Sequence, residues 1–155
     1  MLFRKNGDSN IMVSFDQSEC SVLRITDILG KKWIIFILSE LIHSNELFFN
    51  DLQERLFSKT GEKISARILS LSLKTLENES IIEREVEEST RRVKYSLTKK
   101  GKELEIILAL LKGWSIKWNE LQFKKCKSFT CVHDAVPIMP IDKIIEIYPT
   151  IISKK

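Results

Sequence analysis

Residues 64–104, ISARILSLSLKTLENESIIEREVEESTRRVKYSLTKKGKEL, contain a helical pattern, a strand pattern and a second helical pattern in succession. Leu69, Leu73 and Leu76 recur at helical spacing and predict an amphipathic helix over residues 64–79. The runs IIEREVE and RVKYSL predict two short strands, and the second alternates apolar with polar residues as a half-buried strand does. Because the connecting residues EESTRR lack glycine, we expect a hairpin loop longer than a two-residue turn.

A capped helix is expected directly after this hairpin. Thr98 is a suitable N-cap residue, and Gly101 one turn later allows the helix start to approach the sheet closely. From residue 99 onward, apolar residues alternate three and four positions apart, as in a heptad-like seam. This apolar seam consists of Leu104, Ile107, Leu111, Trp114, Trp118 and Leu121. It is either intramolecular core or dimer interface, and its length favours both, with the tryptophan end buried in a symmetric homodimer.

Three further helices are expected on the N-terminal side. Residues 21–29 have helical apolar spacing. Residues 32–42 are apolar almost all the way round, which predicts a central helix covered on several sides. Asn50 is expected to cap a short third helix with two inward leucines, and Gly61 marks the turn that follows.

The composition is that of one globular domain. The chain has 155 residues, of which 30% are charged and 43% hydrophobic, with only 5 Gly and 3 Pro. We expect an N-terminal arm over residues 1–19, the main domain over residues 20–122 and a C-terminal extension over residues 123–155 with a short helix at 141–148. The net charge of +4 indicates an anionic partner only weakly, because the placement of charge matters more than its sum.

Membrane proteins, secreted proteins and common enzyme classes are not favoured. The longest apolar run, WIIFIL, is too short to cross a bilayer, and the start of the chain does not resemble a secretory signal, so we expect a cytoplasmic protein. The sequence contains no glycine-rich phosphate loop, no G-x-S-x-G and no H-E-x-x-H. We therefore predict no catalytic residue and no cofactor.

The predicted order of elements is that of a winged helix-turn-helix: mainly α with a small β-hairpin, flanked by N- and C-terminal dimerisation helices. In this fold one helix enters the major groove, and the hairpin reaches the flanking backbone or minor groove. On a helical wheel, the face opposite the leucines of residues 64–79 is small and basic. It receives Lys63, Arg67, Ser70, Leu71 and Lys74. The alternative is an ordinary solvated face, and Leu71 also suits a second packing surface.

Successive blocks of the chain resemble HxlR-type winged-helix transcription regulators, relatives of the MarR group. The blocks are ILGKKWIIFILSEL, FNDLQERL, ISARILSLSLKTLENESIIERE and VKYSLTKKGKEL, followed by Trp114. The resemblance covers roughly residues 20–118. It implies a cytosolic homodimer that binds operator DNA through a recognition helix at residues 64–78. The groove-facing residues would then be Ser65, Arg67, Ser70, Leu71 and Lys74.

The chain departs from the family pattern at three places around the hairpin. Asn78, Glu79 and Ser80 stand where the family usually has an aspartate-glycine turn. Phe48 replaces an arginine before the phenylalanine of the third helix, and the loop EESTRR lacks the family's proline. These departures concern the path of the wing rather than the fold.

Basic residues gather on the second half of the predicted wing. Residues 77–88 hold six glutamates and one arginine, whereas residues 91–102 hold six basic residues and no acidic one. Glu85 or Glu87 is expected to pair with Lys94 across the strands. We predict that Arg91 and Arg92 remain free to meet phosphate or a narrow minor groove, with Lys94 as a further backbone contact. An ordinary polar hairpin tip is the alternative.

The three cysteines leave several interpretations open. Cys20 lies where many HxlR-type proteins carry a cysteine, and a thiol beside a helix N-terminus can sense oxidants or electrophiles, although a small buried residue explains it as well. Cys126, Cys131 and His133 fit no common zinc spacing, and a disulfide between the two cysteines would need an oxidising setting. We predict no metal site.

The resulting prediction is a sequence-specific, homodimeric transcription regulator of double-stranded DNA. Two-fold symmetry would place the recognition helices about 34 Å apart on an inverted repeat. A redox or electrophile response is a further possibility, and the sequence does not identify a small-molecule effector. The alternatives are a winged-helix module for an acidic protein or RNA, or a non-specific DNA-binding protein.

Overall fold

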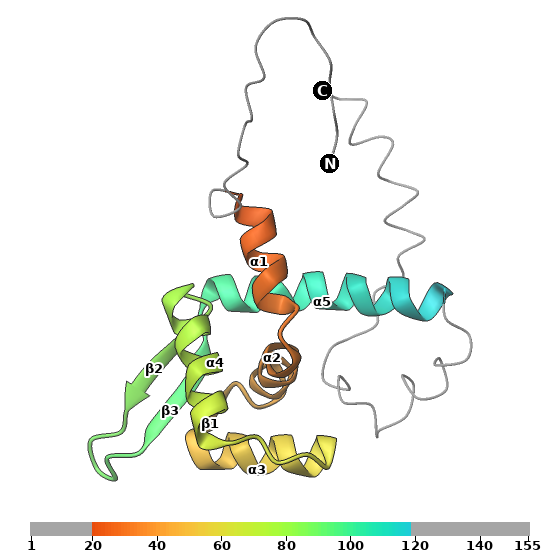
Figure 1. Cartoon of the computed structure of the whole chain (residues 1–155). Helices are drawn as coiled ribbons and strands as arrows, with labels where there is room; N and C mark the ends of the chain where they lie inside the picture. Colours follow the sequence, from red (N-terminus) through yellow and green to blue (C-terminus); the bar gives the residue numbers. More distant parts are fainter. Residues whose placement is uncertain (1–19, 119–155) are drawn as a thin grey trace, which may run out of the picture.

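The computed structural model describes residues 20–118, which form five helices and one three-stranded sheet (Figure 1). The helices are α1 (Ser21–Leu29), α2 (Lys32–Ser44), α3 (Phe49–Thr60), α4 (Ala66–Asn78) and α5 (Lys99–Trp118). The strands are β1 (Glu46–Phe48), β2 (Ile82–Val86) and β3 (Val93–Leu97). This confirms the predicted winged helix-turn-helix, in which the β2–β3 hairpin is the wing and projects past the helices at the lower left of Figure 1.

Several predicted features lie outside the described residues. They are the arm at 1–19, the extension at 123–155 with its helix at 141–148, and Leu121, Cys126, Cys131 and His133. Between residues 20 and 118, no helix has the length and apolar character needed to cross a membrane.

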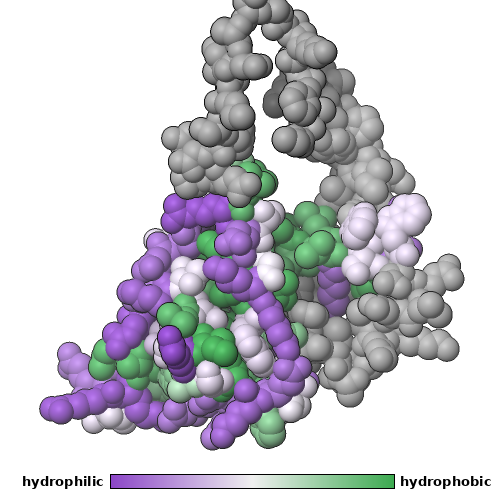
Figure 2. All heavy atoms as spheres, viewed as in Figure 1, coloured by the Kyte–Doolittle hydropathy of each residue, from purple (hydrophilic) through white to green (hydrophobic). Residues whose placement is uncertain are grey.

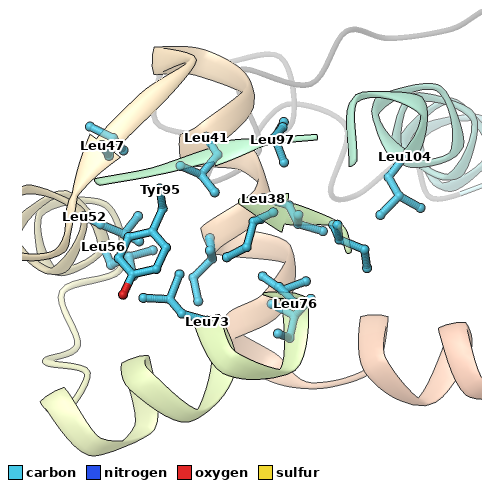
Figure 3. Close-up of a cluster of buried hydrophobic side chains, with 14 of the residues drawn as sticks. Leu38, Leu41, Leu47, Leu52, Leu56, Leu73, Leu76, Tyr95, Leu97 and Leu104 are labelled. Atoms are coloured by element: carbon cyan, nitrogen blue, oxygen red, sulfur yellow. The ribbon is translucent and has the colours of Figure 1, made fainter. Parts of the chain in front are cut away.

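The core forms around α2, as its nearly continuous apolar sequence predicts. This helix contacts α1, α3, α4, β1 and β3. The inward leucines of α3 and α4 are buried against it, and Figure 3 shows several of them around Leu38 and Leu41. They are Leu52, Leu56, Leu69, Leu73 and Leu76. Each fully buried leucine contributes about 1.5–3 kcal/mol relative to an exposed one, so this packing fixes the position of α4.

The sheet contains a strand that the sequence pattern does not predict. β1 pairs antiparallel with β3, from Glu46 opposite Ser96 to Phe48 opposite Lys94, and gives the order β1-β3-β2. A run of three residues is too short to show a strand period. The predicted alternation of β3 is confirmed, because Tyr95 and Leu97 are buried and Val93 packs against the core.

The predicted cap of the third helix is wrong. α3 begins at Phe49, and its N-cap residue is Phe48, whose side chain makes no capping hydrogen bond. Asn50 instead lies within the first turn. The reason is tertiary: Phe48 is still paired with Lys94 in the sheet, so the chain enters the helix directly after the strand.

A side-chain hydroxyl caps the N-terminus of each helix that flanks the wing, α4 and α5. The Ser65 hydroxyl accepts a hydrogen bond from the backbone N–H of Ile68 at 3.2 Å. Thr98 caps α5 as predicted, accepting from the N–H of Gly101 at 3.0 Å. A Cβ at Gly101 would lie 2.0 Å from the carbonyl oxygen of Ile81, so only glycine permits this close approach.

The turn between α4 and the wing keeps a left-handed residue although the family's glycine is absent. Ser80 has φ 54°, a region that favours glycine. Its neighbour Ile81 donates its N–H to the carbonyl of Leu76 at 2.9 Å. The Glu79 carboxylate is paired with Arg24 of α1, and its carbonyl accepts from Lys100 Nζ at 2.6 Å. These contacts hold a serine where glycine would be less strained.

Candidate nucleic-acid interface

The predicted groove-facing side chains lie on the exposed side of α4. They are Arg67, Ser70, Leu71 and Lys74. The buried leucines occupy the other side of the helix, so the exposed face is carried on a rigid support. Arg67 makes no hydrogen bond or ion pair with any residue between 20 and 118, and its guanidinium is free to reach a partner.

Two polar residues of this face are already engaged within the protomer. Ser65 uses its hydroxyl oxygen as the α4 cap but retains its O–H as a donor. Lys74 Nζ lies 3.0 Å from the carboxylate of Glu77, one turn along the helix. A phosphate that binds Lys74 must therefore compete with a neighbouring carboxylate.

Leu71 is 59% exposed on the side of α4 that carries Arg67 and Lys74. It lines a hollow of about 250 Å³ together with Ile68 and Trp33, with Lys31 and Lys32 at its rim. The exposure suits a contact with a thymine methyl. The apolar hollow suits the alternative of a second packing surface.

The wing loop closes, without glycine or proline, through two backbone hydrogen bonds and the Thr90 side chain. Arg91 donates its N–H to the carbonyl of Glu87 at 2.8 Å, and Glu87 donates its N–H to the carbonyl of Arg92 at 2.9 Å. The Thr90 hydroxyl donates to the Glu87 carboxylate at 2.5 Å and accepts from the N–H of Arg92 at 3.2 Å. Arg91 has φ 54°, the left-handed conformation that this closure needs.

The two wing arginines differ, and the prediction that both remain free is wrong for Arg92. Its guanidinium nitrogen Nη2 lies 3.3 Å from both carboxylate oxygens of Asp51, and its Cζ lies 3.9 Å from the ring centroid of Phe48. β1 brings Phe48 and the start of α3 alongside β3, which explains this pairing. The Arg91 side chain has no such partner among residues 20–118.

Lys94 is also paired, as the cross-strand prediction for Glu85 anticipated. Its Nζ lies 3.3 Å from the Glu85 carboxylate and 3.5 Å from that of Glu46. The hydrogen bond to Glu85, followed by the charge of Glu46, raises the pKa of Lys94 above its ordinary 10.5. Glu83 lies on the same face of the sheet, opposite Ser96, so this face of the wing is acidic.

Arg84 lies outside the predicted set but faces the recognition helix. It is opposite Tyr95 in the sheet, and both line a hollow of about 260 Å³ with Ser70, Lys74 and Glu77. A sequence signal for it exists. Arg84 is the one basic residue of 77–88 and alternates with Glu83 and Glu85, so the strand period places it on the opposite face from those glutamates.

The apolar seam of α5 divides into buried and exposed residues. Leu104 belongs to the protomer's core, which corrects its assignment to the dimer interface. Ile107, Leu111, Trp114 and Trp118 are 51% to 68% exposed. At about 100° per residue, these four project within about 60° of one another. Figure 2 shows apolar atoms reaching the surface where α5 lies, whereas hydrophilic ones cover much of the wing side.

Cys20 precedes α1 directly and is its N-cap residue. It is half-buried and free, and its side chain makes no capping hydrogen bond. Within residues 20–118, no three His, Cys, Asp or Glu side chains are grouped so as to hold a metal ion.

Residues 28–123 match the family described as HxlR-like helix-turn-helix. The chain belongs to this family. The HxlR-like chain is 35% identical over 101 residues to YvaP of Bacillus subtilis, an uncharacterised HTH-type transcriptional regulator, covering 64% of this chain and 88% of YvaP.

Solved structures extend this comparison for the HxlR-like fold. The reduced form of the transcriptional regulator YodB from B. subtilis is similar with a TM-score of 0.57 and 29% identity, covering 65% of this chain and 95% of YodB. The redox regulator HypR in its reduced form has a TM-score of 0.55 and 30% identity, covering 68% of this chain and 99% of HypR. These relatives are regulators of transcription or redox regulators by name, not enzymes.

Proposed function

We propose that this HxlR-like protein is a homodimeric transcription regulator that binds an inverted-repeat operator. The observation that carries the proposal is the exposed basic face of α4, held rigidly by buried leucines beside a projecting wing. A helix presented in this way fits the major groove of duplex DNA, where side chains reach the base edges. A cytoplasmic, non-catalytic protein follows from this role.

The recognition helix supplies the base contacts in this proposal. Arg67, which has no ion pair or hydrogen bond among residues 20–118, donates to a guanine edge or a phosphate, and Ser70 bonds a base or phosphate group. Leu71 meets a thymine methyl, while Ser65 and Lys74 contact the backbone.

The basic residues of the wing differ in whether they must leave an ion pair before they can bind DNA. Arg91 reaches phosphate or a narrow minor groove directly, because its side chain has no partner in the described part of the chain. Arg92 and Lys94 contribute only after exchanging their carboxylate partners for phosphate. Arg91 is therefore the main wing contact.

The exposed residues of the α5 seam form the proposed dimer interface. Two tryptophans on one stripe are costly to leave in water, and a two-fold pair buries them. Sedimentation tests this: Trp114→Ala is expected to weaken the dimer, whereas Ile106→Ala, an equally exposed residue on another side of α5, leaves it intact. An 18.1 kDa species at every concentration would contradict the dimer.

Fluorescence anisotropy with two duplexes tests the operator claim. One duplex carries the region upstream of the protein's own gene, and the other carries the same bases in scrambled order. We expect tighter binding to the upstream duplex. Equal affinity for both would instead favour non-specific binding, and preferential binding to RNA or an acidic protein would favour the interaction-module alternative.

Cys20 is the proposed site of a redox or electrophile response. The support is its free, half-buried thiol at the start of α1, together with the similarity to structures of YodB after diamide treatment and of HypR in an oxidised form. Diamide is expected to lower operator affinity of the parent protein but not of Cys20→Ser. The same loss in both proteins would leave Cys20 as a small, half-buried residue without a sensing role.

A further inference from the structure

A hollow between α4 and the wing brings together four donor side chains, of which the family resemblance does not assign the two that come from the strands. Arg84 comes from β2, Ser70 and Lys74 come from α4, and the side chain of Tyr95 comes from β3. The hollow measures about 260 Å³, which is ample for one tetrahedral phosphate group.

Arg84 and Tyr95 are both unpartnered at this place. Arg84 is exposed and has no hydrogen bond or ion pair within the described part of the chain. Tyr95 is only 9% exposed, yet its hydroxyl has no hydrogen-bond partner among the same residues. Figure 3 shows the Tyr95 ring reaching from β3 past Leu52 and Leu56 toward Leu73, with the hydroxyl at its far end. The hydroxyl is not one of the buried unpartnered atoms of residues 20–118, so it is accessible to a group that enters the hollow.

The charged residues of β2 also favour an anion on the side of the strand that faces α4. Arg84 projects toward the recognition helix, whereas Glu83 and Glu85 project from the other face and meet Ser96 and Lys94. The strand thus presents a positive charge on the α4 side and negative charges away from it. An anion approaching the groove between α4 and the wing meets the positive side.

We propose that this hollow binds one phosphate of the DNA backbone, with Arg84 as its main ligand. The guanidinium donates to two phosphate oxygens, and the hydroxyls of Tyr95 and Ser70 donate to the remaining ones. This inference rests on the proposed function and specifies where the backbone crosses between the recognition helix and the wing. Such a contact fixes the register of α4 in the major groove without reading sequence.

Glu77 limits how strongly the hollow attracts anions. Its carboxylate lines the hollow and holds Lys74 at 3.0 Å, so the local charge is one positive group in excess, that of Arg84. Lys74 can bind the phosphate only if it leaves its ion pair with Glu77. Replacing Glu77 by glutamine therefore frees Lys74 and is expected to strengthen binding to every duplex.

The test combines Arg84→Gln with neutral methylphosphonate groups placed singly along the upstream duplex. Arg84→Gln is expected to weaken binding to upstream and scrambled duplexes alike, by about tenfold at moderate salt, and to lower the salt slope by about one. One methylphosphonate position should weaken the parent protein but leave Arg84→Gln unchanged, because the contact is already lost. Tyr95→Phe should weaken binding at the same position by a smaller factor.

Two variants serve as controls for this experiment. Lys102→Gln removes one positive charge from α5, away from the hollow, and is expected to change neither affinity nor salt slope appreciably. Glu77→Gln should tighten binding to both duplexes. Thermal unfolding of Arg84→Gln should match the parent, because the side chain is exposed.

The outcomes separate this inference from the proposed function. If Arg84→Gln leaves the DNA affinity and its salt slope unchanged, the phosphate hollow is overturned. It is also overturned if the variant changes the ratio of affinities for the two duplexes but leaves the salt slope unchanged. Equal binding of the parent protein to both duplexes overturns the operator claim alone, since the change in salt slope of Arg84→Gln still reports the backbone contact in any register.

Discussion

The recognition helix and the wing both carry basic residues, but the structure makes them available to different degrees. On α4, Arg67 is exposed and has no partner among residues 20–118, and the acid that holds Lys74 is three residues away on the same helix. On the wing, Arg92 and Lys94 form ion pairs with carboxylates of other elements, whereas Arg91 has no side-chain partner within those same residues. A cluster of basic residues in a sequence therefore does not by itself give the charge that a ligand meets.

The largest expected effect concerns the support of the recognition helix. Leu73→Ala truncates a fully buried side chain on the core side of α4 and is expected to lower the free energy of unfolding by about 2–5 kcal/mol. Leu71→Ala, two residues earlier on the exposed face, should change it by less than about 0.5 kcal/mol. Urea denaturation measures both, and similar losses would show that α4 is not seated on one side only.

Arg67→Ala should separate base reading from backbone attraction. Loss of a bidentate base contact costs about 1–3 kcal/mol, so we expect operator affinity to fall roughly 10- to 100-fold. Affinity for the scrambled duplex should fall much less. Arg91→Ala is the comparison on the wing and should weaken both duplexes by a similar factor. If Arg67→Ala behaves like Arg91→Ala, the helix and the wing do not differ in role.

Asp51→Asn should give the wing a second available arginine and so make it more like the recognition helix. Removing the carboxylate charge releases Arg92 from its ion pair, and we expect affinity for all duplexes to rise roughly two- to fivefold. Asp27→Asn, which changes the charge equally on α1, is the matched control. Weaker binding by Asp51→Asn would mean that the Arg92 pair positions the wing and that its loss costs more than the freed charge contributes.

The smallest expected effect is the pH dependence of the wing. The carboxylates of Glu85 and Glu46 raise the pKa of Lys94 in the folded protein above its ordinary 10.5. Its contribution is therefore fully present below about pH 10.5 and is lost as the pH rises through the higher folded value. Unfolding measured from pH 9 upward should show a steeper loss for the parent than for Lys94→Met. Identical curves would show that the Lys94 pairs do not stabilise the wing.

Local patterns predicted much of the fold. The leucine spacing of α4, the alternation of β3 and the Thr98 cap all concern residues near one another in the sequence, and the structure confirms each. The close approach at Gly101 is confirmed as well, although its partner, Ile81, comes from the segment before β2. β1 and the true start of α3 were not predictable, because they depend on pairing between Phe48 and Lys94, which are far apart along the chain.

The candidate site was predictable to a smaller extent. The exposed face of α4 follows from helical geometry alone, and Arg84 could have been placed by the period of β2. The engagement of Arg92 could not, since Asp51 lies 41 positions away and reaches it only through the β1–β3 pairing. Leu104 likewise shares the period of its exposed neighbours on α5, and only packing buried it.

The sequence was sufficient to predict the order of the helices and of the two wing strands, the side of α4 that is buried, and the membership of a helix-turn-helix family. It could do so because helical and strand periods, caps and turn residues act over a few positions. Tertiary structure alone decided which basic groups are free, which part of the α5 seam stays exposed, and that Arg84, Ser70, Lys74 and Tyr95 share one hollow. Those properties depend on side chains from different elements, whose partners are set only when the elements pack together.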